Sequence, residues 1–83
     1  MEYNIVYKSS VKKDLKKIDN KELLKIFGEI EKILKSKPLK GKELKGEFEG
    51  LLSYRIGNYR VIYTILGNTI LVLRISHRKD AYK

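Results

Sequence analysis

Two stretches in the second half of the chain contain the side chains best suited to phosphate chemistry. One is residues 59–63, Tyr-Arg-Val-Ile-Tyr, and the other is residues 74–82, Arg-Ile-Ser-His-Arg-Lys-Asp-Ala-Tyr. Arginine is permanently charged and binds phosphate oxygens through a planar fork, whereas histidine and tyrosine can move protons. Because the two stretches fall on consecutive predicted strands, their side chains can be neighbours. The pattern predicts a basic site for a polyanion, for which nucleic acid is the default.

The distribution of charge separates two kinds of basic surface. The chain has 83 residues and a net charge of +9. Residues 1–50 hold 13 lysines mixed with nine acids, which is typical of a solvated surface that can also grip RNA electrostatically. Residues 51–83 hold all four arginines, two lysines and a single acid. We therefore expect the specific binding chemistry in the second half.

Composition excludes several classes of site. The chain has no cysteine and one histidine, so disulfides, a thiol nucleophile and the usual zinc ligand sets are ruled out, and we expect no metal and no cofactor. The apolar runs are too short to span a membrane, and the first residues lack a signal-peptide pattern. Residues 1–83 should form a single domain, and we expect it to be cytoplasmic.

Hydrophobic periodicity predicts one strand, two helices and three further strands. Residues 3–8 are rich in β-branched and aromatic residues, typical of a strand. Apolar residues spaced by three and four predict a helix from Ser9 or Ser10 to Asp19 and a second helix from Asn20 to about Ser36, before Pro38. Residues 37–50 are loop-like. The remaining predicted strands are 51–56, 58–66 and 69–76, joined by Gly-Asn turns with positive φ.

These elements predict an α+β fold with the order β-α-α-β-β-β, in which a helical hairpin packs on one face of an antiparallel sheet. Strict alternation divides each strand between two faces. In 58–66, one face holds Tyr59, Val61, Tyr63 and Ile65, and the other holds Arg60, Ile62, Thr64 and Leu66. In 69–76, Leu71, Leu73 and Ile75 oppose Ile70, Val72, Arg74 and Ser76. The face that is part apolar and part arginine is typical of a binding surface.

Three motifs resemble the RelE branch of the RelE/ParE toxin superfamily. They are Leu44-Lys45-Gly46, residues 54–63 (Tyr-Arg-Ile-Gly-Asn-Tyr-Arg-Val-Ile-Tyr) and residues 77–82 (His-Arg-Lys-Asp-Ala-Tyr). The resemblance covers essentially the whole chain and implies a RelE-like microbial ribonuclease fold. It also implies a toxin of a type II toxin–antitoxin system that cuts messenger RNA in the ribosomal decoding site and so stops translation.

The chemistry implied by the resemblance is a metal-free transesterification of RNA. A ribose 2′-OH attacks the adjacent phosphate, leaving a 2′,3′-cyclic phosphate and a 5′-OH. By this resemblance Arg60 and Arg78 hold the scissile phosphate. Tyr82 orients the substrate or moves a proton, and His77 is the general acid. Further contacts to the RNA backbone are expected from Arg55, Arg74, Lys79 and Lys42.

The chain departs from the family pattern at the general base. Well-known members carry two lysines on the strand before the central arginine. The corresponding positions here are Leu51 and Ser53. Lys45 of the preceding loop, or alternatively Lys42, is the lysine expected to reach the site. Some relatives use a loop glutamate as the base, which here would be Glu43 or Glu47.

The resemblance also implies the partners. These are a small acidic RelB-like antitoxin, the A site of the 30S ribosomal subunit with its mRNA and rRNA, and operator DNA only through the antitoxin complex. Two other functions stay open, a ParE-like inhibitor of DNA gyrase and a non-catalytic relic that binds the ribosome or RNA. The closing motif argues against the first, and the missing strand lysines leave room for the second.

Each candidate residue also has a purely structural interpretation. Arg60 could pair with an acid of the helices. The other interpretations are a solvated charge for Arg55, Arg74 and Lys45, a surface turn for His77, and a frayed chain end for Tyr82. For Tyr59 and Tyr63, packing in the core or on the sheet is favoured over stacking on bases.

Overall fold

The computed structural model describes residues 3–77, except for the side chain of Glu47. Its main elements are β1 (Asn4–Tyr7), α1 (Ser9–Leu15), α2 (Asn20–Glu29), β2 (Lys42–Glu43), β3 (Leu52–Ile56), β4 (Tyr59–Leu66) and β5 (Thr69–His77). Helix α2 continues into a π-helical turn, Ile30–Leu34, and short 3-10 turns occupy Pro38–Lys40 and Gly46–Phe48. The predicted order of elements is confirmed, and the two-residue strand β2 is added to it within the predicted loop.

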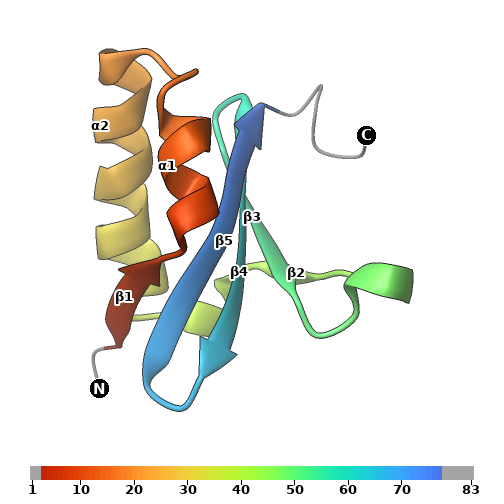
Figure 1. The fold of residues 1–83 in the computed structure, drawn as a ribbon. Coiled ribbons are helices and arrows are strands. Elements are labelled where there is room, and N and C mark those ends of the chain that lie inside the picture. Colours follow the sequence, from red (N-terminus) through yellow and green to blue (C-terminus); the bar gives the residue numbers. More distant parts are fainter. Residues whose placement is uncertain (1–2, 78–83) are drawn as a thin grey trace.

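Both helices lie against one face of a five-stranded sheet (Figure 1). The strand order is β1-β5-β4-β3-β2. Strands β2 to β5 pair antiparallel, which confirms the predicted meander, but β1 pairs parallel with β5. The helical hairpin returns the chain to the end of the sheet where β1 began, so β5 runs in the same direction as β1 (Figure 1). The sheet is therefore mixed, not wholly antiparallel as expected.

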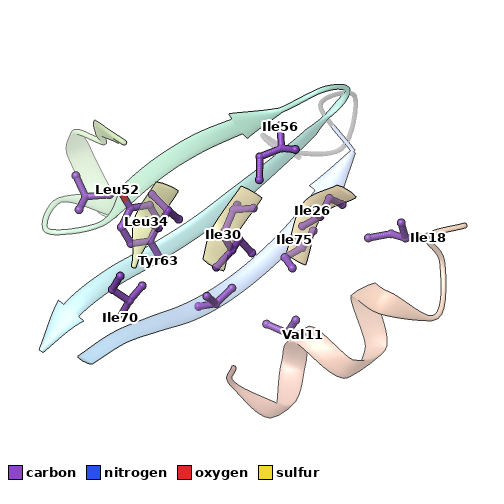
Figure 2. Close-up of a cluster of buried hydrophobic side chains, with 12 residues drawn as sticks. Val11, Ile18, Ile26, Ile30, Leu34, Leu52, Ile56, Tyr63, Ile70 and Ile75 are labelled. Atoms are coloured by element: carbon purple, nitrogen blue, oxygen red, sulfur yellow. The ribbon is translucent and has the colours of Figure 1, made fainter. Parts of the chain in front are cut away.

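The core lies between the sheet and the helices, as Figure 2 shows. Ile26, Ile30 and Leu34 recur every four residues and are completely buried, so one stripe of α2 and its π-helical turn faces the sheet. Helix α1 contributes Val11, and the segment after it contributes Ile18. The sheet contributes Leu52, Ile56, Val61, Tyr63, Ile70, Val72 and Ile75. The buried face of β4 is the one that holds Val61 and Tyr63. Within residues 3–77, the helices therefore leave the arginine-bearing face of β4 uncovered, and this face is called the open face below.

The two hairpin turns have the predicted chemistry. Gly57 and Gly67 begin the turns that follow β3 and β4, with φ of 59° and 61°. None of the described residues other than glycine has a positive φ, so only the first of the two central residues in each turn has a positive φ. That is the pattern of a type II′ turn, which matches the twist of antiparallel strands and needs glycine at its first position.

A β-bulge in β5 changes which side chains share a face. In the β4–β5 ladder, Tyr63 pairs with Val72, whereas Ile62 pairs with Arg74. Leu73 is therefore an extra residue opposite the Ile62–Tyr63 step. Beyond it, Ile75 is buried together with Val72, although strict alternation places the two on opposite faces. The prediction for this strand is wrong beyond Val72 because one inserted residue shifts the alternation by one.

Candidate functional site

Arginines of neighbouring strands face each other on the open side of the sheet. Arg55 of β3 pairs with Arg60 of β4, and Arg60 pairs with Ser76 of β5. Directly opposed residues share a face, and the adjacent Val61 is buried on the helix side. Two guanidinium groups held in this way offer donors to an oxyanion from both sides, whereas like charges directly opposite each other repel when no anion lies between them.

A second row of side chains crosses the same face one step further along the strands. It runs from Lys42 of β2 through Ser53 and Ile62 to Arg74 of β5. Basic side chains from four consecutive strands therefore share one face. The register sets Lys42 directly beside Ser53, one of the two positions at which the resemblance implies a lysine. The short strand β2, which the sequence did not predict, is what brings Lys42 there.

The other candidates for the general base lie elsewhere. Lys45 is exposed in the loop between β2 and the turn Gly46–Phe48, and it lines a cavity of about 690 Å³ with Glu43. Glu43 pairs with Leu52, whose side chain is in the core, so Glu43 does not share the face of Arg60. The side chain of Glu47 lies outside the described part of the chain.

Tyr63 forms hydrogen bonds to the segment that precedes Lys42. Its buried hydroxyl donates to the carbonyl of Pro38 at 2.6 Å and accepts from the backbone N–H of Gly41 at 3.0 Å. Burial raises the pKa of Tyr63 above its ordinary value, so the phenol stays a neutral donor. The packing role favoured for Tyr63 is confirmed, and these two hydrogen bonds add to it the positioning of the segment before β2.

Arg74 is engaged by an acid of α1. Its Nε lies 3.0 Å and its Nη2 3.3 Å from the two carboxylate oxygens of Asp14, which is only 9% exposed. An ion pair between a strand arginine and an acid of a helix, which the sequence offered for Arg60, is therefore present at Arg74. Sequence reasoning missed Asp14, although it follows Val11 by three residues and precedes Ile18 by four, which places a carboxylate on the apolar stripe of its helix.

His77 lies on the other side of the sheet from Arg60. It pairs with Tyr59, and the two rings meet edge to face with centroids 5.3 Å apart. Tyr59 has the same parity as the buried Val61, so both rings are on the helix side. They line a cavity of about 330 Å³ together with Lys17 of the segment after α1. The structure therefore places Arg55, Arg60 and Lys42 on one face of the sheet, and His77 on the other.

Three predicted site residues, Arg78, Lys79 and Tyr82, lie outside the described residues. Within 3–77, no three histidine, aspartate or glutamate side chains gather as ligands for a metal ion. No helix in that part of the chain is long and apolar enough to cross a membrane.

Comparison with known proteins identifies the family to which this chain belongs. Residues 5–82 match the family model described as the ParE toxin of type II toxin–antitoxin systems. Toxin RelG of Mycobacterium tuberculosis is 32% identical over 90 residues, which covers 100% of this chain and 99% of the relative. The chain belongs to the RelE/ParE superfamily. It is a toxin of a type II toxin–antitoxin system.

Solved structures show that the toxin shares its fold with RelE proteins held in complexes. The RelBE2 toxin–antitoxin complex of M. tuberculosis matches with a TM-score of 0.89 and 31% identity, covering 96% of this chain and 95% of that one. The RelE–RelB complex of Pyrococcus horikoshii matches with a TM-score of 0.73 and 27% identity, covering 98% and 100%. The two-helix, mixed-sheet architecture is therefore that of RelE-like proteins.

Proposed function

We propose that the toxin is a ribosome-dependent endoribonuclease that cuts messenger RNA in the A site of the 30S subunit and so inhibits translation. The observation that carries the proposal is the opposed pair Arg55 and Arg60, with Lys42 on the same open face. A flat basic face of this kind suits an RNA backbone better than a small buried substrate. The likeness to Toxin RelG and to solved RelE–RelB complexes supports a toxin of the RelE kind, for which the resemblance implies this activity.

The reaction we propose is attack of the ribose 2′-OH on its own 3′-phosphate, giving a 2′,3′-cyclic phosphate and a free 5′-OH. Negative charge builds up on the phosphate oxygens in the transition state, and fixed guanidinium groups stabilise it without reorganising. Arg60 fills this role from β4, and Arg78 joins it from the residues that follow β5. Arg55 opposes Arg60 and holds the neighbouring phosphate.

Lys42 is our candidate for the base that takes the 2′-OH proton. It shares the face of Arg60 and lies in register with Ser53, a position at which the resemblance implies a lysine. Lys45 is the alternative from the adjacent loop. The leaving oxygen takes its proton from Tyr82, because the ring of His77 lies on the helix side of the sheet and does not share the face of Arg60.

The proposed partner is a RelB-like acidic antitoxin, as in the solved complexes of the relatives. The open face has a second half that is apolar, in which Val6 and Leu66 are 49% and 59% exposed and Leu71 lies opposite Val6. A chain that covers both halves would bury the apolar side chains and neutralise the arginines. Operator DNA is then reached only through the antitoxin.

The test is cleavage of message on programmed ribosomes by the purified toxin, with the new ends mapped and their 5′-OH chemistry determined. Arg60→Ala should lower the cleavage rate by about a hundredfold or more, because one oxyanion donor is typically worth about 10² to 10³ in rate. Arg60→Lys keeps the positive charge but loses the planar guanidinium that binds two phosphate oxygens at once, so it should retain part of the cleavage rate. Lys21→Ala removes an exposed charge of α2 and serves as the matched control.

The match to the ParE family model favours one alternative, a DNA gyrase inhibitor. That function predicts loss of gyrase supercoiling with purified toxin and no message cleavage on ribosomes. A toxin that binds ribosomes in a salt-sensitive way yet neither cuts message nor inhibits gyrase would instead be a non-catalytic relic. Either result would overturn the endonuclease proposal.

A further inference from the structure

The edge of β5 changes its hydrogen-bonding partner halfway along the strand. Strand β1 pairs with β5 only as far as Tyr7 and Val72, and the N–H of Lys8 makes the last bond, to the Val72 carbonyl. Beyond this point, side chains of α1 form the hydrogen bonds to the backbone of β5 in place of the backbone of β1. Ser10 Oγ donates to the Leu73 carbonyl at 3.0 Å, and the Asp14 carboxylate accepts further along.

Asp14 makes three hydrogen bonds at this edge. Its Oδ2 accepts the backbone N–H of Ile75 at 3.1 Å and Arg74 Nε at 3.0 Å, and its Oδ1 accepts Arg74 Nη2 at 3.3 Å. A buried carboxylate is costly unless it is paired and hydrogen-bonded in this way. Both donor residues come directly after the bulge at Leu73, where the ladder to β4 is interrupted. The carboxylate thus holds the strand where its pairing with the sheet is weakest.

The clamp lies next to the proposed cleavage site. Ile75 is followed by Ser76, which opposes Arg60, and then by His77. Arg78 comes three residues after the clamped amide in the sequence. Asp14 itself belongs to α1, on the helix side, and it is only 9% exposed. It therefore acts on the site through the direction of β5 and not by touching RNA.

We propose that Asp14 is the positioning residue of this site, because its carboxylate fixes the tip of β5 through the Ile75 amide and Arg74. The proposal rests on the proposed ribonuclease function. Its consequence is that the clamp sets the placement of Ser76 against Arg60 at the end of β5. Since misplacement of reacting groups by about 1 Å can cost around a hundredfold in rate, loss of the clamp should slow cleavage without abolishing ribosome binding.

The experiment compares Asp14→Ala, Asp14→Asn and Ser10→Ala with the wild type on programmed ribosomes. Asp14→Ala should lower the saturated cleavage rate about ten- to hundredfold and leave the half-saturating ribosome concentration within about twofold. Asp14→Asn keeps a neutral acceptor for the Ile75 amide and should recover part of the rate. Ser10→Ala removes the other α1 bond to this edge, before the tip, and should leave the saturated rate within about twofold. If Asp14→Ala does not fold, Asp14→Asn alone carries the comparison with Ser10→Ala.

Amide hydrogen exchange gives a readout that does not need cleavage. Asp14→Asn should speed exchange at Ile75 and His77, while Val61 in the middle of β4 keeps the wild-type rate. Faster exchange across the whole sheet, or cleavage by the Asp14 variants at the wild-type rate, would overturn the proposal. If the wild type does not cleave, the ribonuclease function fails, and local or global loss of protection then decides whether Asp14 fixes the tip of β5.

Discussion

Replacing Tyr63 by phenylalanine is the substitution that most directly tests how the basic face is assembled. It removes one oxygen atom and leaves the buried ring in place. That oxygen donates to the Pro38 carbonyl at 2.6 Å and accepts from the Gly41 N–H at 3.0 Å. Since Gly41 directly precedes Lys42, the variant releases the segment that delivers a lysine to the open face.

The expected loss of stability is about 2–3 kcal/mol. The Pro38 carbonyl belongs to a buried residue, and leaving it without a donor costs roughly 1–3 kcal/mol. The Gly41 N–H is half-exposed and can turn to water, so its loss adds only about 0.5–1 kcal/mol. A domain of 83 residues is stable by roughly 4–12 kcal/mol, so this is a large share. At about 4–8 °C per kcal/mol, the melting temperature should fall by more than about 8 °C.

The assay is thermal and urea unfolding of the purified variant, together with cleavage on programmed ribosomes at a temperature where it is folded. Tyr54→Phe is the matched control, because Tyr54 is half-buried on the neighbouring strand and its hydroxyl makes no hydrogen bond among the described residues. It should change stability by less than about 0.5 kcal/mol. Tyr63→Phe should also slow cleavage, whereas Tyr54→Phe should not.

Gly41→Ala supplies an independent check on the same contact. A Cβ at Gly41 would overlap the Tyr63 hydroxyl oxygen and lie 3.0 Å from two carbons of its ring. The substitution should therefore destabilise the wild type more than it destabilises Tyr63→Phe, which no longer carries the oxygen. A melting temperature of Tyr63→Phe within about 2 °C of the wild type, or equal effects of Gly41→Ala in both backgrounds, would refute the reasoning.

Two further predictions concern stability. Burial, with a smaller effect of Glu31, raises the pKa of Tyr7 from 10.0 to about 12, so the folded protein favours the neutral phenol. The contribution of this phenol to the free energy of unfolding is complete below pH 10 and is lost as the pH rises toward 12. Urea unfolding between pH 9 and 11.5 should therefore show a shallower decline for Tyr7→Phe than for the wild type, and parallel curves would contradict this assignment. Gly67→Ala should cost roughly 1–2 kcal/mol because its φ is +61°, although nothing lies within 4 Å of the added carbon. Gly28→Ala, in equally open space on α2, should instead stabilise by up to about 1 kcal/mol, so unfolding curves showing the same sign for both would exclude the conformational explanation.

Local elements of the fold followed from the sequence because their signals are local. Apolar residues spaced by three and four predicted the two helices, and the structure confirms them, with Ile26, Ile30 and Leu34 as the buried stripe of the second. The Gly-Asn pairs predicted tight turns, which Gly57 and Gly67 make with positive φ. The prediction of a wholly antiparallel sheet failed because the partner and direction of β1 depend on the path of the helices, which no spacing within the strand encodes.

The candidate site was predictable in its composition but not in its geometry. The sequence by itself determined that Arg60 and Val61 lie on opposite faces of β4, because successive side chains of a strand alternate between the two faces. Only the tertiary structure decided that a bulge at Leu73 sends Arg74 to Asp14, that a two-residue strand sets Lys42 beside Ser53, and that His77 lies across the sheet from Arg60. Alternation along a strand is a property of the chain, whereas register, bulges and ion pairs depend on which distant segments pack together.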